Sequence, residues 1–238
     1  MAEPAGRESH RGVPGAREAG FTAPEDTPEL RRRREAVAAL GARLRELTET
    51  SIRTEVPVDV LEQAAIDVES VTATLRERQR KPQQPASVDD LIGGKRMFNP
   101  VIGEGHPSAP PVEYFTDGER VEGRCTLGLT HEGPPMSTHG GISALLLDQI
   151  LGHAAAAAGN AGPTTDLTVR YRKPVPLDVP LRIWARVVSV EDGHALATGA
   201  IATMSDPESA LVEAEARFRT LSREQAMRIF PALFSQAR

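Results

Sequence analysis

The chain has little cysteine and few aromatic residues, and both shortages exclude classes of protein. Among its 238 residues Cys125 is the single cysteine, so an internal disulfide and a thiolate metal cluster are excluded. Aromatic residues make up 4% of the chain, which predicts a mostly aliphatic core. The same shortage makes the aromatic stacking platforms of single-strand nucleic-acid binders hard to assemble.

An excess of basic charge and a long apolar run are also missing. The chain has 28 Lys and Arg against 33 Asp and Glu, a formal net charge of −5, which argues against a nucleic-acid partner or an acidic membrane surface. No segment approaches the roughly 18 apolar residues of a membrane span, and the N-terminus has no apolar signal segment. We therefore expect a cytoplasmic protein with no membrane span.

The N-terminal third combines a tail with two amphipathic helices. Residues 1–28 are rich in glycine and proline, show no hydrophobic period and predict a disordered tail. Two apolar stripes at helical spacing predict a helical hairpin over residues 29–82. Because two such helices are marginal alone, we expect the hairpin to pack on the rest of the domain or to bridge subunits. The stripes are Leu30, Val37, Leu40, Leu44 and Leu47, followed by Val60, Ala64, Val68, Val71 and Leu75.

The remainder predicts one α+β domain. Proline-rich residues 83–111 indicate a connecting segment with little regular structure. Residues 112–222 then predict an antiparallel sheet curved around one long, buried helix, without the alternating βαβ units of a dinucleotide-binding fold. Residues 223–238 form a C-terminal tail or short helix. The expected helix is Gly140–Ala158, and the expected strands are Val112–Thr116, Glu119–Thr130, Thr165–Arg172, Leu181–Val190, Ala195–Met204 and Ala210–Thr220.

The long helix begins at a pair of glycines, Gly140 and Gly141. Backbone N–H groups in a first helical turn have no intrahelical partner, lie at the positive end of the helix dipole and can hold an oxyanion. Glycine lets a ligand approach these groups closely. The structural alternative is that the glycines only permit tight packing of the helix entry.

Asp148 is a lone carboxylate in the middle of this apolar helix. An unpaired charge is costly to bury, so Asp148 needs either a partner or a chemical role. A hydrogen bond to a neighbouring strand or to a second subunit would explain it. The functional explanation is a nucleophile, or a general base that activates water.

Helix geometry separates these two features within one chain. Asp148 follows His139 by nine residues, which corresponds to roughly 13 Å along a helix axis. Two subunits with antiparallel long helices across a two-fold axis would bring the N-terminus of one helix to the middle of the other. We therefore predict an obligate dimer in which Gly140 of one chain meets Asp148 of its partner.

The stretch His139–Asp148 resembles the helix entry of hotdog-fold acyl-CoA thioesterases of the PaaI-like branch, which show His-Gly-Gly followed by an aspartate at this distance. Leu167–Leu177 resembles the strand that follows the central helix in that family. The resemblance spans roughly residues 96–222. It implies an α+β hotdog fold and hydrolysis of an acyl-CoA substrate at a site shared by two subunits, in a homo-oligomer built from dimers and without a cofactor.

The resemblance also implies roles for single residues. Asp148 would be the nucleophile or general base, and the N–H of Gly140 or Gly141 would polarise the thioester carbonyl. Thr164 would orient water, with Thr165 as a close rival. His139 would set the turn or assist in the site, although a core histidine bonded to a backbone carbonyl fits equally well.

Other polar residues have weaker assignments. Some family members carry Asn or Gln six residues before the histidine, where this chain has Gly133. The basic side chains of Arg170, Arg172 and Lys173 would meet coenzyme A phosphates, or would simply be solvated on an exposed strand face.

Several classes of site are not supported by the sequence. His131 and His153 lack metal-site spacing, so we expect no metal, and Cys125 is expected to be an inert thiol. A non-catalytic acyl-CoA-binding or regulatory hotdog protein is the main alternative to the enzyme. An enoyl-CoA hydratase ranks lower, because no neighbouring Asp and His pair occurs around residues 131–153.

Overall fold

The computed structural model describes residues 24–229 except residues 92, 111, 118 and 119. The expected N-terminal tail therefore lies mostly outside the described residues, as do Glu119, where one expected strand begins, and residues 230–238 of the expected C-terminal tail or short helix. The helices are α1 (Pro28–Arg53), α2 (Val58–Arg76), the 3-10 turn η1 (Leu129–His131), α3 (Gly140–Ala157) and α4 (Arg223–Ile229). The strands are β1 (Glu113–Asp117), β2 (Arg120–Thr126), β3 (Thr164–Tyr171), β4 (Pro180–Glu191), β5 (His194–Thr203) and β6 (Val212–Arg219).

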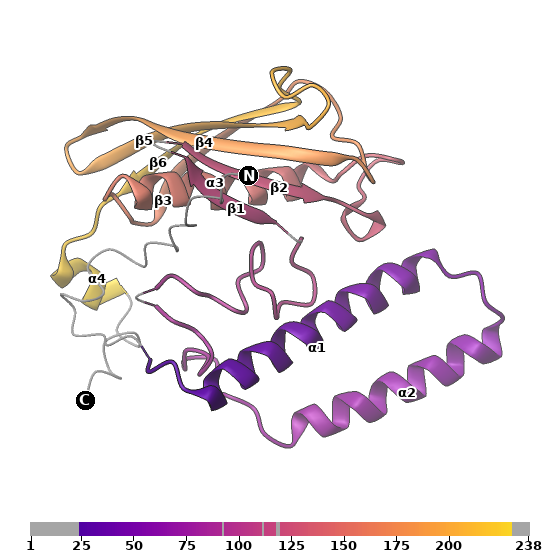
Figure 1. Ribbon diagram of the computed structural model, residues 1–238. Coiled ribbons are helices and arrows are strands. Elements are labelled where there is room, and N and C mark those ends of the chain that lie inside the picture. Colours follow the sequence, from indigo (N-terminus) through magenta and orange to yellow (C-terminus); the bar gives the residue numbers. More distant parts are fainter. Residues whose placement is uncertain (1–23, 92, 111, 118–119, 230–238) are drawn as a thin grey trace, which may run out of the picture.

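One antiparallel sheet of six strands forms a layer over the long helix α3, and α1 and α2 lie beyond it on the far side of the connecting segment (Figure 1). The strand order is β1-β2-β4-β5-β6-β3, which leaves β3 at one edge. The predicted α+β arrangement of a sheet around a long helix is confirmed.

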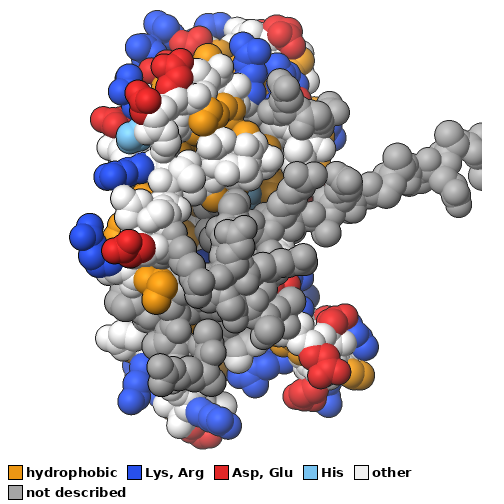
Figure 2. Space-filling model, turned by 90° about the vertical axis from the view of Figure 1, so that its left-hand side faces the viewer, with side chains coloured by type: hydrophobic (Ala, Val, Ile, Leu, Met, Phe, Trp, Pro, Cys, Tyr) orange, Lys and Arg blue, Asp and Glu red, His pale blue; other side chains and the backbone are white. Residues whose placement is uncertain are grey.

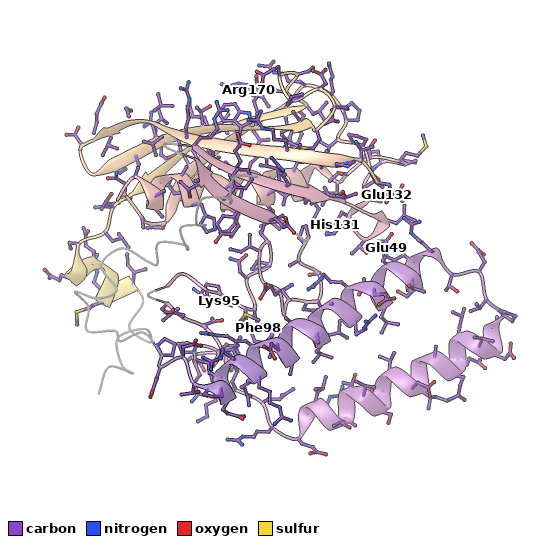
Figure 3. The ribbon with its side chains drawn as sticks, in the orientation of Figure 1. Glu49, Lys95, Phe98, His131, Glu132 and Arg170 are labelled. Atoms are coloured by element: carbon purple, nitrogen blue, oxygen red, sulfur yellow. The ribbon has the colours of Figure 1, made fainter. Side chains whose placement is uncertain are left out.

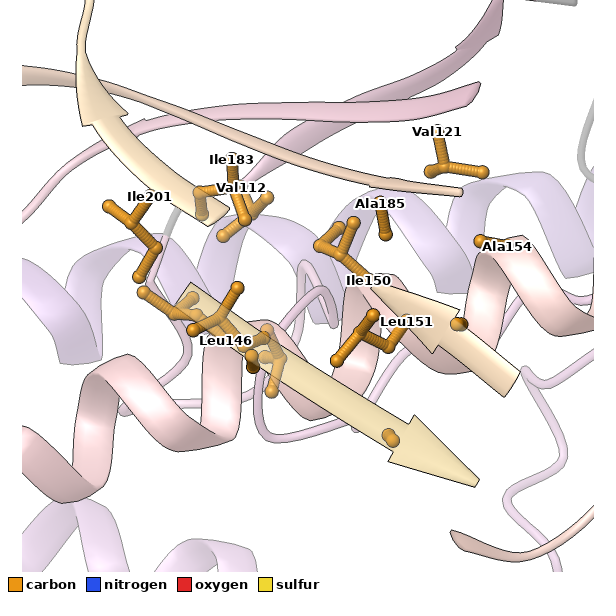
Figure 4. Packing of buried hydrophobic residues seen from close by; sticks show 14 of the residues in the cluster. Val112, Val121, Leu146, Ile150, Leu151, Ala154, Ile183, Ala185 and Ile201 are labelled. Atoms are coloured by element: carbon orange, nitrogen blue, oxygen red, sulfur yellow. The ribbon is translucent and has the colours of Figure 1, made fainter. Parts of the chain in front are cut away.

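The core lies between α3 and the sheet and is aliphatic, as the shortage of aromatic residues predicts. The α3 residues Leu146, Ile150 and Leu151 are fully buried against β4 and β5 (Figure 4). Small side chains on the inner faces of β5 and β6 let the helix approach the sheet closely. These are Ala195, Ala197, Ala214 and Ala216.

The strand predicted over Glu119–Thr130 is too long, because β2 ends at Thr126. The chain turns there into η1, whose Leu129 and Thr130 N–H groups both donate to the Glu49 carboxylate of α1. Glu49, about 80 residues away in the sequence, thus holds the turn that follows β2, and strand alternation alone carries no sign of this contact.

Within one protomer, the predicted burial of the long helix holds for one side of α3 only. Gly141 and Leu145 are exposed and Asp148 is half-buried, and these positions follow one another along a single face of the helix. The edge strand β3 is similarly open, with Leu167 and Tyr171 exposed. Helix α3 thus carries more apolar surface than the sheet of its own protomer buries.

The two N-terminal helices differ in how they contact the rest of the chain. Pro28 begins α1, and the Thr27 hydroxyl caps it by accepting from the Leu30 N–H at 3.1 Å. Val37 and Ala38 of α1 pack on a small cluster of Ala86, Val88 and Met97. By contrast, α2 buries none of its residues.

Charged side chains of both signs are mixed on one face of the molecule (Figure 2). On the face in Figure 2, Lys and Arg lie among Asp and Glu without a broad field of one sign. Within the described residues, no helix is long and apolar enough to cross a membrane.

Candidate functional site at the α3 N-terminus and Asp148

The first turn of α3 is organised by His139. This residue is the N-cap of the helix, and its Nδ1 accepts the Gly141 N–H at 3.0 Å. The N–H groups of Ile142 and Ser143 donate to the His139 carbonyl. Among the described residues, no hydrogen-bond acceptor is found for the Gly140 N–H, so Gly140 offers the available donor of the glycine pair.

Tyr171, at the end of the edge strand β3, holds Gly140 next to that strand. Its hydroxyl donates to the Gly140 carbonyl at 2.9 Å. A Cβ built on Gly140 would lie 3.3 Å from the Tyr171 ring, so a small side chain there needs only a slight shift of an exposed tyrosine.

The loop before α3 explains why position 133 carries no polar side chain. The Gly133 N–H donates to the Ser137 carbonyl, and the His139 N–H donates to the His131 carbonyl, each at 2.9 Å. A Cβ at position 133 would lie 2.6 Å from the His139 Cα, closer than real contacts allow. An Asn or Gln at this position does not fit the loop as it is folded here.

Asp148 has a partner on β3. The Thr164 hydroxyl donates to Asp148 Oδ1 at 2.8 Å. This contact depends on a register shift between Thr164 and Asp166, which pairs Thr164 with the inward-facing Phe218 and Asp166 with Arg217. Such a bulge re-aims a side chain, and here it turns Thr164 toward α3.

The rival threonine lies elsewhere. Thr165 is the bulged residue itself, and its hydroxyl donates to the Arg217 carbonyl at 3.2 Å. In the structure Thr164, and not Thr165, contacts the carboxylate.

The three basic candidates are not near Asp148 within one protomer. Arg170 lies on the outer face of the sheet, opposite α3 (Figure 3). Arg172 pairs with Glu213 at 2.9 Å, and the Lys173 ammonium donates to the Ser209 hydroxyl at 3.1 Å. Their role toward coenzyme A phosphates stays a prediction.

The two halves of the candidate site are also separated within one chain. Gly140 begins α3 and Asp148 follows eight residues later, about 12 Å along the axis. Each half lies on the open surface formed by α3 and β3.

Glu49 is a residue that the sequence analysis missed, because it looks like any solvated charge on an amphipathic helix. It lies under the loop that carries His131 and Glu132 (Figure 3). Its Oε2 accepts both the Thr130 N–H at 2.9 Å and the Thr130 hydroxyl at 2.8 Å, and Oε1 pairs with Arg53 at 2.6 Å. The His131 carbonyl in turn accepts the His139 N–H, so α1 braces the loop that begins α3.

The protonation of Glu49 reflects these contacts. Burial by itself raises the pKa of this carboxyl, but the hydrogen bonds from Thr130, Arg53 and Leu129 outweigh it and lower the pKa from 4.5 to about 2. A carboxyl with a lowered folded-state pKa stabilises the fold above its unfolded pKa, and this stabilisation is lost as the pH falls toward 2.

We expect Glu49→Gln to lower the free energy of unfolding by about 1–3 kcal/mol at pH 7, a range that allows for the partial exposure of the side chain. The deficit should shrink as the pH falls from about 5 toward 2, because wild-type Glu49 then becomes protonated too. Denaturant unfolding at several pH values measures it. Glu46→Gln, on an exposed carboxylate of the same helix, is the matched control, and an equal loss in both variants would contradict the bracing role.

The environments of two further candidates, Cys125 and His131, are dominated by burial. Cys125 is buried, and burial raises the pKa of its thiol to about 12, which keeps it protonated and unreactive. Burial also lowers the pKa of His131. No group of three or more His, Cys, Asp or Glu that could hold a metal ion occurs in the part of the chain that the structure describes.

Comparison with known proteins gives the family. The model of the thioesterase superfamily matches residues 137–198, a range that includes His139, Asp148 and Thr164. A crystal structure of a thioesterase superfamily protein is 33% identical, covers 76% of this chain and 94% of its own, and superposes with a TM-score of 0.68. The chain therefore belongs to the thioesterase superfamily and has its hotdog fold.

Two other matches are weaker, because one covers only a short stretch of sequence and the other has low sequence identity. The acyl-coenzyme A thioesterase THEM4 of Xenopus laevis is 38% identical over 60 residues, which is 25% of this chain and 27% of that protein. The chain thus matches about a quarter of the length of this curated relative. The zebra fish thioesterase superfamily member 2 is 19% identical, covers 52% of this chain and 91% of its own, and has a TM-score of 0.46.

Proposed function

We propose that this protein hydrolyses an acyl-CoA thioester to a carboxylic acid and free coenzyme A. The observation that carries the proposal is the hydrogen bond between Thr164 and Asp148, which holds a half-buried carboxylate on an open face of α3. Membership of the thioesterase superfamily supports the reaction class. The partial match to an acyl-coenzyme A thioesterase supports coenzyme A as the leaving group.

The Gly140 N–H serves as the oxyanion donor in this proposal. It lies at the N-terminus of an 18-residue helix, where the dipole favours negative charge. A thioester carbonyl oxygen that accepts this N–H gains charge as the tetrahedral intermediate forms, so the hydrogen bond strengthens in the transition state. The Gly141 N–H already donates to His139 Nδ1. In this proposal Gly141 therefore holds the turn and does not bind the carbonyl oxygen.

Asp148 supplies the second half of the reaction. Thr164 occupies Oδ1, which orients the carboxylate so that Oδ2 points its lone pairs at water or at the carbonyl carbon. As a general base, Asp148 takes a proton from the water that attacks the carbonyl carbon, and the thiolate leaves. As a nucleophile, its carboxylate attacks the carbonyl carbon, the C–S bond breaks and the thiolate leaves, and water then hydrolyses the resulting acyl anhydride. Both routes use the same carboxylate and give the same products.

The site is completed by a partner protomer in the proposal. Gly140 and Asp148 of one chain are too far apart to act on one carbonyl, as the length of the intervening helix shows. The unpaired edge of β3 and the open face of α3 are a surface that two copies can share across a two-fold axis. That arrangement brings Gly140 of one chain to Asp148 of the other.

Release of free thiol from short, medium, long and aromatic acyl-CoAs tests the proposal. We expect turnover of at least one class by the wild-type chain. Acyl-CoA binding without thiol release would overturn hydrolysis and favour a non-catalytic binding protein instead. Turnover of carrier-protein thioesters alone would overturn coenzyme A as the leaving group.

A further inference from the structure

Helix α2 is exposed along its whole length. It has 19 residues and buries none of them, and in Figure 1 it runs antiparallel to α1 but stands apart from it. Its large apolar side chains are open to solvent: Leu61 is 45% exposed, Val68 45%, Val71 54% and Leu75 48%. A lone helix of this length is marginal in water, and an exposed apolar stripe of this size is typical of an interaction surface.

The stripe on α2 has the spacing of a coiled-coil seam. Its members repeat at three and four residues, so they share one face of the helix. They are Leu61, Ala64, Val68, Val71 and Leu75.

A matching stripe runs along the exposed side of α1. It has the same three and four spacing and lies next to the face that packs on the connecting segment. Its members are Arg33, Ala36, Leu40, Arg43 and Leu47, with Leu40 and Leu47 38% and 45% exposed.

The two helices carry opposite charge. Helix α1 has seven arginines against four glutamates, a net charge of +3. Helix α2 has four acidic residues against one arginine, a net charge of −3. Glu62, Asp67 and Glu69 flank the α2 stripe, and Arg33 and Arg43 lie within the α1 stripe. Opposite charges beside an apolar seam favour pairing of α1 with α2 and disfavour pairing of α2 with another α2.

We infer that α2 binds α1 of a second copy of this chain. The chain carries both halves of one complementary surface, which is what a two-fold contact between identical subunits requires. Its own α1 is not the occupant, because the connection of Thr54–Pro57 is extended at both ends, with ψ angles of 142° and 157°, and holds α2 away. The contact stands independently of the proposed hydrolysis.

Cysteine cross-linking of full-length chains tests this contact. One preparation carries Leu40→Cys on α1, and the other carries Leu61→Cys, Val68→Cys or Leu75→Cys on α2, so that the three positions sample the seam. The natural Cys125 is buried and does not compete. After mixing and mild oxidation, we expect a covalent dimer of one chain from each preparation on a denaturing gel, at least tenfold above the Ser70→Cys control on the opposite face of α2.

Three results would overturn the inference. The first is no cross-linking above the Ser70→Cys control at any of the three positions. The second is a cross-link formed only inside one chain when Leu40→Cys and Val68→Cys are combined, which would mean that the hairpin closes on itself. The third is undiminished cross-linking between the Leu40→Cys and Leu61→Cys preparations when the α2 chain also carries Val68→Lys, beside Ser70→Lys as the control, since a positive charge in the seam should repel the arginines of α1.

Discussion

Replacing Asp148 with asparagine is expected to lower thiol release by roughly 10²–10⁴-fold. Asparagine keeps an oxygen that accepts the Thr164 hydroxyl but can neither take a proton from water nor attack the thioester. The fold should survive, because the side chain is half-buried and its hydrogen bond is retained. Steady-state kinetics with thermal unfolding measures both effects.

Asp166→Asn is the matched control for this change. Asp166 is an exposed carboxylate on the same strand as Thr164, and its register places it opposite Arg217 on the outer side of the sheet. Its replacement should leave turnover within about threefold of wild type. Equal activity of Asp148→Asn and Asp166→Asn would remove Asp148 from the chemistry.

The second large effect is expected from removing one backbone N–H. Gly140 is the first residue of α3, a position that accepts proline, and the His139 ψ of 132° lies in the extended range favoured before proline. We expect Gly140→Pro to lower kcat by roughly 10²–10³-fold, because the oxyanion donor is lost. KM should change little, because the lost interaction strengthens only in the transition state.

Gly140→Ala separates the loss of the N–H from the added side chain. Alanine brings the same Cβ near Tyr171 at 3.3 Å but keeps the donor, so its turnover should stay within about tenfold of wild type. If alanine and proline lower kcat equally, the added atoms are responsible and the Gly140 N–H is not the oxyanion donor.

Local patterns were sufficient to predict most of the fold. The alternation in Leu181–Val190 and Ala195–Met204 located β4 and β5 to within a residue or two at each end, and the apolar run Gly140–Ala158 located α3. These patterns report a property of each segment alone, namely which side chains face the core. Such patterns can therefore be recognised without knowing which segment packs against the core-facing side chains.

Features that depend on distant contacts were not predictable in this way. The choice between Thr164 and Thr165 is made by a bulge against β6, and nothing in the local alternation marks that bulge. The turn that follows β2 is held by Glu49, which lies about 80 residues away in the chain. The open face of α3 is apolar in sequence, and composition does not reveal whether the sheet or a second subunit covers it.

Mixing two inactive variants tests the shared site most directly. Asp148→Ala and Gly140→Pro each disable both sites of their own homodimer, but a mixed dimer keeps one intact pair. Co-refolding equal amounts should therefore restore about a quarter of wild-type turnover. Asp148→Ala mixed with Thr164→Ala should restore none, because both changes damage the same half of the site. Failure of the first mixture to exceed its parents, with mixed dimers present, would contradict a site built from two protomers.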